Sequence, residues 1–142
     1  MYFYFCTAIL LSNDCCDPWY RQSVRVSMGH IFKKPIVRVT SLSETLHALQ
    51  HTYGVQVYGA VIDENAQKLK NIAIQSGQHN RWCGIVGSED KGISKEVRAV
   101  CENKDKTIGG LIRIDMSENV DSMSITVAAG IFLHGLRRLE MD

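Results

Sequence analysis

The residues best suited to chemistry follow segments that have the apolar pattern of buried strands. Residues 58–60 (YGA), 87–92 (GSEDKG) and 115–124 (DMSENVDSMS) each lie at the end of such a segment. Parallel strands bring their carboxyl ends to one edge of a sheet, and ligands bind at that edge. These three groups therefore form the candidate site.

Segment 87–92 combines two glycines with a helix start directly after it. Gly87 and Gly92 permit close approach of a ligand to the backbone and positive φ angles, and the helix that begins at Ser94 presents a positive amino-terminal end. An ordinary glycine-containing turn between a strand and a helix has the same pattern. The segment is neither a phosphate-binding P-loop, because Gly-Lys-Ser/Thr is missing, nor a nucleophile elbow.

A second group of interest is basic and aromatic. Residues 18–43 contain no acidic side chain, while five cations are interleaved with Trp, Tyr, His and Phe. These cations are Arg21, Arg25, Lys33, Lys34 and Arg38, and the first four are the candidates for binding RNA phosphates. A solvated helix face is an equally good interpretation of the pattern. Among the histidines only His47 and His51 have a metal-ligand spacing, and no Glu stands beside the first, so no metal site is expected.

Composition limits the class of protein that must position these residues. The 142 residues are 45% hydrophobic and 22% charged, with a net charge of +1, which fits one α/β domain and excludes a binder that works by bulk charge. The five cysteines form no Cys-x-x-Cys pair, so a reducing, cytoplasmic location is expected. Residues 1–11 are apolar but too short to span a membrane, and a buried strand is preferred there over a signal peptide.

Along the chain, apolar runs of strand length alternate with helical patterns. Strands are predicted at 7–12, 36–39, 55–62, 82–86 and 111–114, and helices at 19–32, 42–53, 66–74, 94–101 and from 125 onward. Ser41 and Glu44 form a capping box at the start of the second helix. The alternation predicts a parallel sheet with helices on both faces.

Three ordered blocks connect this sequence with a known family. Residues 86–94 (VGSEDKGIS), 114–116 (IDM) and 122–130 (SMSITVAAG) resemble the second and third motifs of the SpoU/TrmH class of SPOUT RNA methyltransferases. Residues 17–32 are similar to the stretch that follows that family's second strand. The resemblance implies a single α/β-knot domain over residues 1–142, with a C-terminal deep trefoil knot. It further implies 2′-O-ribose methylation of tRNA or rRNA with S-adenosylmethionine, and a homodimer.

The resemblance also assigns roles to individual positions. The cofactor would be held by Tyr58, Gly59, Ala60, Val86, Gly87, Ile114, Met116 and Met123. Glu89 matches the family's motif carboxylate, although an ion-pairing or helix-end glutamate fits equally well. Ser124 stands where the family has asparagine, and its shorter hydroxyl still donates and accepts a hydrogen bond. Glu89 and Ser124 are therefore the catalytic candidates.

One family motif has no counterpart in this sequence. The first motif, Asn-x-Gly-x-x-x-Arg-x-Ala, supplies the arginine thought to activate the ribose hydroxyl, whereas here no Asn-x-Gly precedes Cys15 and the first arginine is Arg21. A chain shortened at its N-terminus relative to the family is therefore expected. Two alternatives stay open: a degenerate homologue that binds cofactor or RNA without catalysis, and an unrelated doubly wound nucleotide-binding domain. The sequence names neither the RNA nor, for a eukaryotic source, an organellar or nucleolar location.

Overall fold

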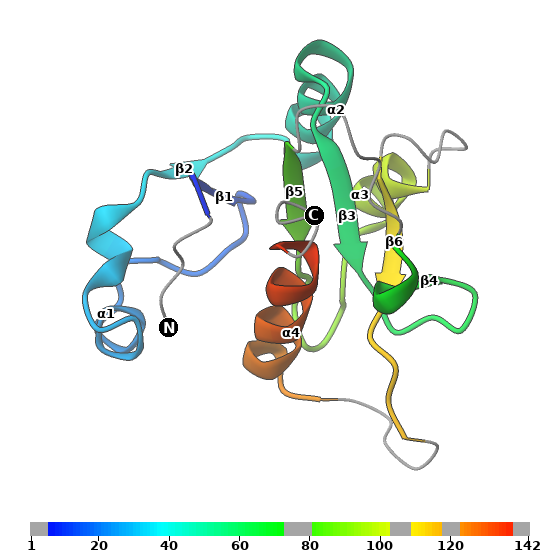
Figure 1. Ribbon diagram of the computed structural model, residues 1–142. Helices are drawn as coiled ribbons and strands as arrows, with labels where there is room; N and C mark the ends of the chain where they lie inside the picture. Colours follow the sequence, from blue (N-terminus) through cyan, green and yellow to red (C-terminus); the bar gives the residue numbers. More distant parts are fainter. Residues whose placement is uncertain (1–5, 73–80, 103–108, 118–122, 138–142) are drawn as a thin grey trace. The chain divides into compact units, whose positions relative to one another are not determined.

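The computed structural model describes residues 6–72, 81–102, 109–117 and 123–137 (Figure 1). The chain divides into two compact units, Met1–Thr45 and Leu46–Asp142, which are described separately below. Within the described ranges, no helix combines the length and the apolar character needed to cross a membrane.

The first unit is a two-stranded parallel sheet with a short helical connection. Strand β1 (Ile9–Leu11) pairs with β2 (Ile36–Arg38), and between them lie α1 (Arg21–Val26) and the 3-10 helix η1 (His30–Lys33). The rings of Trp19 and Phe32 stack at 5.3 Å between centroids, which ties the segment before α1 to η1. Both strands expected in this part of the sequence are confirmed.

The continuous helix expected over 19–32 is wrong. Helix α1 ends at Val26, and Met28 (φ 52°) and Gly29 (φ 76°) are both left-handed. The N–H of Gly29 donates to the carbonyl of Val24 at 3.0 Å, which closes the helix in the way typical of a C-terminal glycine. Gly29, inside the range predicted as one helix, is therefore the helix stop.

Arg38 holds together the loop that follows β1. Its guanidinium donates four hydrogen bonds of 2.8–3.1 Å to the carbonyls of Ser12, Asn13, Cys15 and Cys16. Both cysteines of this loop are exposed. None of the chain's five cysteines is in a disulfide.

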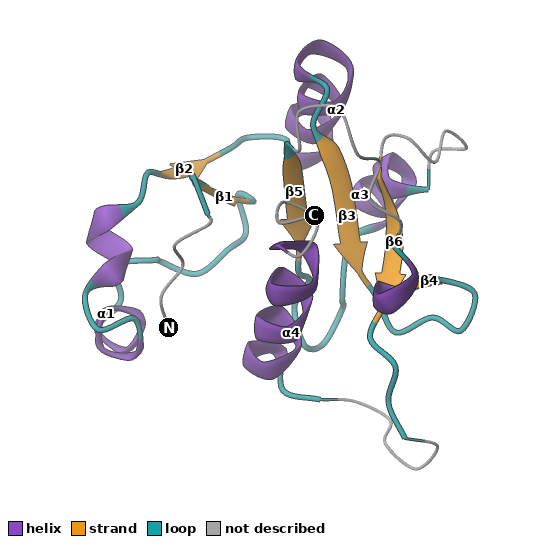
Figure 2. Ribbon diagram, in the orientation of Figure 1, coloured by secondary structure: helices purple, strands orange, loops and turns teal. Residues whose placement is uncertain are grey.

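The second unit contains a four-stranded parallel sheet in the order β4-β6-β3-β5 (Figure 2). Its strands are β3 (Gln56–Ala60), β4 (Gln67–Lys68), β5 (Trp82–Ile85) and β6 (Gly109–Arg113). The strand predictions at 55–62, 82–86 and 111–114 are thus confirmed. The helix predicted at 66–74 is wrong for the described residues, because 67–71 form β4 and the 3-10 helix η2 (Leu69–Asn71).

Helices pack on both faces of this sheet. Helix α3 (Lys95–Cys101) and helix α4 (Ile125–Arg137) lie on opposite faces, as the alternation of side chains along the strands requires. A Cβ at Gly84 would point at Phe132 of α4 (3.0 Å), whereas one at Gly59 would point at Cys101 of α3 (3.1 Å). The parallel α/β architecture expected from the sequence is therefore confirmed.

One part of the core of the second unit lies between the sheet and α4. Tyr58, Ile112, Phe132 and Leu136 form a buried cluster there, and Phe132 and Leu136 have no exposed surface. Helix α2 (Leu42–Tyr53) follows its predicted bounds, with the N–H of Glu44 donating to Ser41 Oγ at 3.4 Å.

Candidate functional site

The sheet of the second unit brings the ends of three strands to one edge. Because β3, β5 and β6 are all parallel, their carboxyl ends coincide, with Gly59 beside Ile85 and Ala60 beside Ile112 in the register. Helix α4 begins at the same edge and runs back along the sheet (Figure 1). Hence the sequence groups 58–60 and 87–92 and the start of the group 115–124 converge, although they are far apart along the chain.

Two of the residues predicted to hold the cofactor instead pack against other parts of the protein. The Tyr58 side chain is buried in the core, its hydroxyl donates to Gln56 Oε1 at 3.2 Å, and burial raises its pKa. A Cβ at Gly59 would lie 3.0 Å from Ile93 Cδ1 and 3.1 Å from Cys101 Sγ, so this glycine lets α3 pack close to the sheet. The space beside Gly59, a predicted cofactor residue, is thus filled by Ile93 and by Cys101 of α3.

Apolar side chains do reach solvent at this edge. Ile62, just after β3, is 75% exposed, and Val86, just after β5, is 37% exposed. Ile114, Met116 and Met123 are half-buried. Ile62 was not among the predicted site residues, although its place at the end of an apolar run was a usable signal. The edge therefore offers apolar surface next to main-chain polar groups.

The loop after β5 closes on itself. Ser88 N–H donates to the carbonyl of Gly92 at 3.2 Å, Gly92 N–H donates to that of Ser88 at 2.8 Å, and the N–H of Lys91 donates to Ser88 Oγ at 3.1 Å. Gly92 is left-handed at φ +64°. A Cβ at Gly87 would lie 2.0 Å from the carbonyl carbon of Gly92. Gly87 is therefore required by the loop itself, a reason that the sequence pattern did not reveal.

The two catalytic candidates are exposed near this edge. Glu89 lies at the tip of the Ser88–Gly92 loop. Ser124 immediately precedes α4, and its carbonyl accepts the N–H of Ala128 at 2.9 Å as the first acceptor of the helix. Serine is favoured at the residue before the first turn of a helix. Ser124 therefore has a structural role at the start of α4 in addition to its predicted catalytic role.

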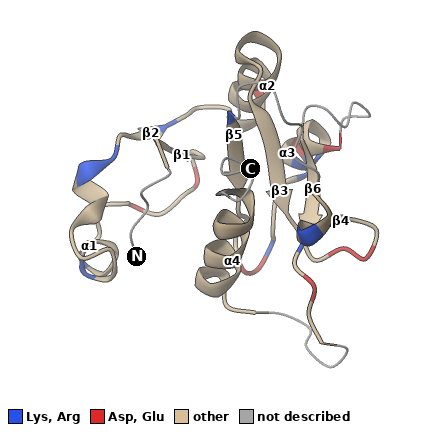
Figure 3. Ribbon diagram, in the orientation of Figure 1, with Lys and Arg blue, Asp and Glu red and all other residues tan. Residues whose placement is uncertain are grey.

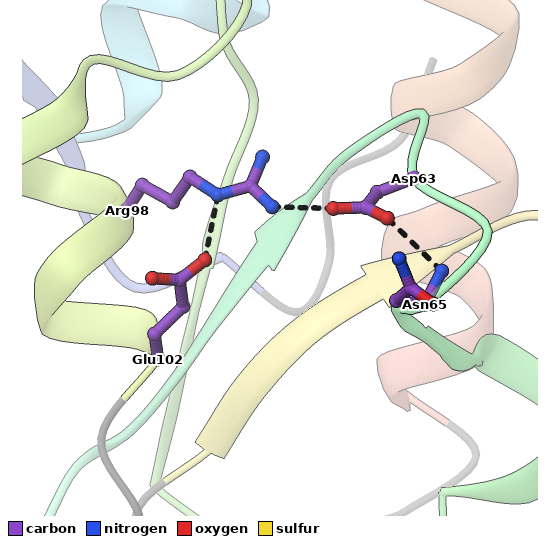
Figure 4. A network of polar contacts seen from close by, with 4 residues as sticks. All are labelled: Asp63, Asn65, Arg98 and Glu102. Atoms are coloured by element: carbon purple, nitrogen blue, oxygen red, sulfur yellow. Dashed lines mark hydrogen bonds and ion pairs between the residues drawn. The ribbon is translucent and has the colours of Figure 1, made fainter.

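A polar network fixes the turn that follows β3 (Figure 4). Arg98 of α3 donates to Glu102 Oε1 at 2.7 Å and to Asp63 Oδ2, and Asp63 Oδ1 accepts the N–H of Asn65 at 2.9 Å. The hydrogen bonds from the Asn65 backbone and from Arg98 lower the pKa of Asp63. The spacing of Arg98 and Glu102 on one helix was detectable in the sequence, whereas Asp63, 35 residues earlier, was not.

A second ionic cluster, the β6-end cluster, consists of Lys68, Lys70, Arg113 and Asp115. Asp115 Oδ1 lies 3.2 Å from Lys68 Nζ, and Asp115 Oδ2 lies 3.0 Å from Lys70 Nζ. Arg113 Nη2 lies 3.9 Å from Asp115 Oδ1. Hydrogen bonds from Lys70 and Lys68 lower the pKa of Asp115. Sequence reasoning missed this cluster, because its cations come from β4, η2 and β6.

The predicted RNA-binding residues all belong to the first unit. Arg21 and Arg25 are exposed one turn apart on α1, Lys33 is exposed at the end of η1, and Lys34 is half-buried (Figure 3). Among the residues described, no group of three His, Cys, Asp or Glu side chains is arranged to hold a metal ion.

Comparison with known proteins identifies the class. The model of the SpoU rRNA Methylase family matches residues 1–134, and the chain belongs to this family. It is 31% identical over 124 residues to an uncharacterized tRNA/rRNA methyltransferase of Mycobacterium bovis, a match that covers 87% of this chain and 40% of the relative. It is 28% identical over 134 residues to the 23S rRNA (guanosine-2′-O-)-methyltransferase RlmB of Vibrio cholerae, covering 94% and 49%.

Solved structures agree with this assignment. The AdoMet-bound rRNA methyltransferase of Sinorhizobium meliloti superposes with a TM-score of 0.73 at 28% identity, over 93% of this chain and 46% of that protein. A TrmH-family protein of Porphyromonas gingivalis gives a TM-score of 0.71 at 26% identity, over 92% and 48%. The chain thus spans half or less of the length of these relatives.

Proposed function

We propose that this chain is the methyltransferase domain of an RNA 2′-O-ribose methyltransferase that uses S-adenosylmethionine. The observation that carries the proposal is the convergence of 58–60, 87–92 and the start of 115–124 at the carboxyl edge of one parallel sheet, within a chain that belongs to the SpoU family. That edge is where parallel sheets bind their ligands. The relatives named above as RNA methyltransferases, one of them crystallised with AdoMet, support the proposal.

The residues at this edge suit the adenosine part of the cofactor. An adenine ring has apolar faces and a polar edge, and the site offers the exposed apolar side chains of Ile62 and Val86 beside main-chain donors and acceptors. Ile114, Met116 and Met123 add further apolar surface. In this proposal Gly59, Ala60 and Gly87 contribute through the backbone, and Tyr58 supports β3 from the core. When bound, S-adenosylmethionine supplies an electrophilic methyl group.

The protein's part in the reaction is to position the ribose and handle its proton. A ribose hydroxyl is a weak acid, so a positioned base or cation is needed, and such catalysis is worth about 10²–10⁴-fold. Glu89, exposed at the loop tip, would orient the substrate or a cationic group. Ser124 would hold the ribose by a hydrogen bond. Arg21, Arg25, Lys33 and Lys34 would bind phosphates of the tRNA or rRNA.

A second candidate function is a module that binds cofactor or RNA without catalysis. The observation in its favour is Ser124, which stands in place of the family's asparagine and also serves as a helix start. In that case the residues needed for turnover would be incomplete, while the sheet edge would still bind the cofactor or RNA.

The test separates binding from turnover. Calorimetry with S-adenosylhomocysteine measures binding, and transfer of a tritiated methyl group to unfractionated tRNA and rRNA measures activity. The proposal expects both, with the label in 2′-O-methylnucleosides after nuclease digestion, and loss of transfer with retained binding in Glu89→Gln. Binding without transfer would favour the non-catalytic module, label on the bases would exclude the 2′-O assignment, and no binding to folded protein would overturn both.

The family relationship extends the proposal to assembly and topology. We propose that the chain is a single α/β-knot domain with a C-terminal trefoil knot, that it forms a homodimer, and that it works in the cytoplasm without a metal. Val127 and Ile131, one turn apart on α4, are 53% and 41% exposed and would be covered in a dimer. Sedimentation that shows a monomer at high micromolar concentration would contradict the dimer.

A further inference from the structure

The β6-end cluster carries more positive than negative charge. Three cations, Lys68, Lys70 and Arg113, surround the single carboxylate of Asp115. The two lysines take one oxygen each, at 3.2 and 3.0 Å, while Arg113 stays at 3.9 Å. The Nε of Arg113 is buried and makes no hydrogen bond within the described part of the chain. The one carboxylate balances only one of the three positive charges, so the cluster keeps a net positive charge. It also keeps N–H donors that Asp115 does not use.

The cluster is open to solvent. The Lys70 side chain is 67% exposed and that of Lys68 is 38% exposed, so a large polyanion can reach both. Figure 3 shows the basic residues gathered at β4 and at the end of β6. In an exposed place, exchanging one anionic partner for another costs little desolvation, because neither lysine is removed far from water.

The position of the cluster relates it to the proposed site. Asp115 lies between Ile114 and Met116, both predicted to contact the cofactor, and β6 ends at the same edge as β3. The cofactor itself is a poor occupant, because its ammonium and sulfonium outnumber its carboxylate and a positive cluster repels a net cation. A phosphodiester carries a fixed negative charge and acceptor oxygens that suit Lys and Arg.

We propose that Lys68, Lys70 and Arg113 form a phosphate-binding site for the RNA backbone beside the reacting nucleotide, and that Asp115 holds these cations in place until RNA displaces it. The inference rests on the proposed function in taking RNA as the partner. It adds a contact surface in the second unit to the basic residues of the first unit. Phosphate contacts fix the register of a nucleic acid, so this site would position the ribose.

The experiment uses the full chain and a short fluorescein-labelled RNA of mixed sequence. Anisotropy gives the Kd at several salt concentrations for wild type, for Lys68→Gln/Lys70→Gln and for Asp115→Asn. Arg81→Gln is the matched control, because Arg81 is exposed at the amino end of β5, at the opposite edge of the same sheet. Circular dichroism checks that every variant is folded.

The variants are expected to act in opposite directions. The double lysine variant should bind RNA more weakly, and its slope of log Kd against log salt should fall by about 1.4, or about 0.7 for each single-strand phosphate that a lysine no longer neutralises. Asp115→Asn should bind more tightly than wild type, a gain that a purely structural role would not produce. Arg81→Gln should change the slope by less than half as much as the double variant.

Three outcomes overturn the inference: a wild-type slope in the double variant, an equal loss in Arg81→Gln, or weaker binding by Asp115→Asn. Calorimetry with S-adenosylhomocysteine on the same proteins keeps the two proposals apart. Failure of cofactor binding in wild type counts against the proposed function alone, whereas unchanged RNA binding in the double variant counts against this phosphate site alone.

Discussion

Gly87→Ala is expected to open the loop that carries Glu89 while leaving the sheet intact. The added Cβ would lie 2.0 Å from the carbonyl carbon of Gly92, 2.3 Å from its oxygen and 2.4 Å from the N of Ile93. These are backbone atoms, so no side-chain rotation relieves the overlap. The loop must separate from Gly87, which breaks its closing hydrogen bonds.

The cost follows from the hydrogen bonds that break. The Ser88–Gly92 pair contributes two hydrogen bonds, of 3.2 and 2.8 Å, and Lys91 to Ser88 Oγ a third, of 3.1 Å. Each is worth a net 0.5–1.5 kcal/mol, and in an exposed loop water replaces part of it, so the free energy of unfolding should fall by about 2 kcal/mol. Gly92→Ala should cost about 1 kcal/mol through its left-handed backbone alone.

Urea unfolding followed by circular dichroism measures the destabilisation, and hydrogen exchange at the amides of Ser88, Lys91 and Gly92 localises it. Gly110→Ala is the control, because a Cβ there meets nothing within 4 Å and alanine suits a strand better than glycine. This control should be about 0.5 kcal/mol more stable than wild type. A Gly87→Ala protein with wild-type stability and unchanged loop exchange would refute the reasoning. Retained cofactor binding with an open loop would show that the loop does not form the cofactor site.

Further expectations concern packing and charge. Phe132→Ala, at a side chain with no exposed surface, should lower the free energy of unfolding by about 3–5 kcal/mol in urea titrations. Arg38→Lys should accelerate hydrogen exchange of the backbone amides in the loop after β1, because a single ammonium group cannot replace a guanidinium that donates to four carbonyls. Burial raises the pKa of Cys101 to about 12, so at neutral pH iodoacetamide should label it only after unfolding. The pKa values of Asp63 and Asp115 are lowered in the folded state, so their stabilisation is present above about pH 4 and lost as the pH falls further. Urea midpoints between pH 7 and 3 measure this change, and Asp63→Asn should flatten the curve.

Elements with a strong local signal were predicted well. The capping box and the apolar spacing located α2 within its bounds, and the apolar runs located β3, β5 and β6. The errors lie where the local pattern is ambiguous. Gly29 could continue or end a helix, and only the hydrogen bond from its N–H to Val24 decides that it ends one. The polar stretch at 66–72 has no clear period, and pairing of Lys68 with Arg113 of β6 makes its first part, Gln67–Lys68, a strand.

The family, the parallel α/β class and the three segments that meet at one sheet edge can be predicted from the sequence, because motifs and periodicity are local properties of the chain. The roles of the individual residues follow from the fold. Gly59 packs against α3, Gly87 allows its own loop to close, and Tyr58 belongs to the core. The fold also places Lys68 of β4 within 3.2 Å of Asp115, which follows β6 and is distant in sequence. Such roles depend on which atoms from other segments lie beside a residue, and spacing along one chain does not contain that information.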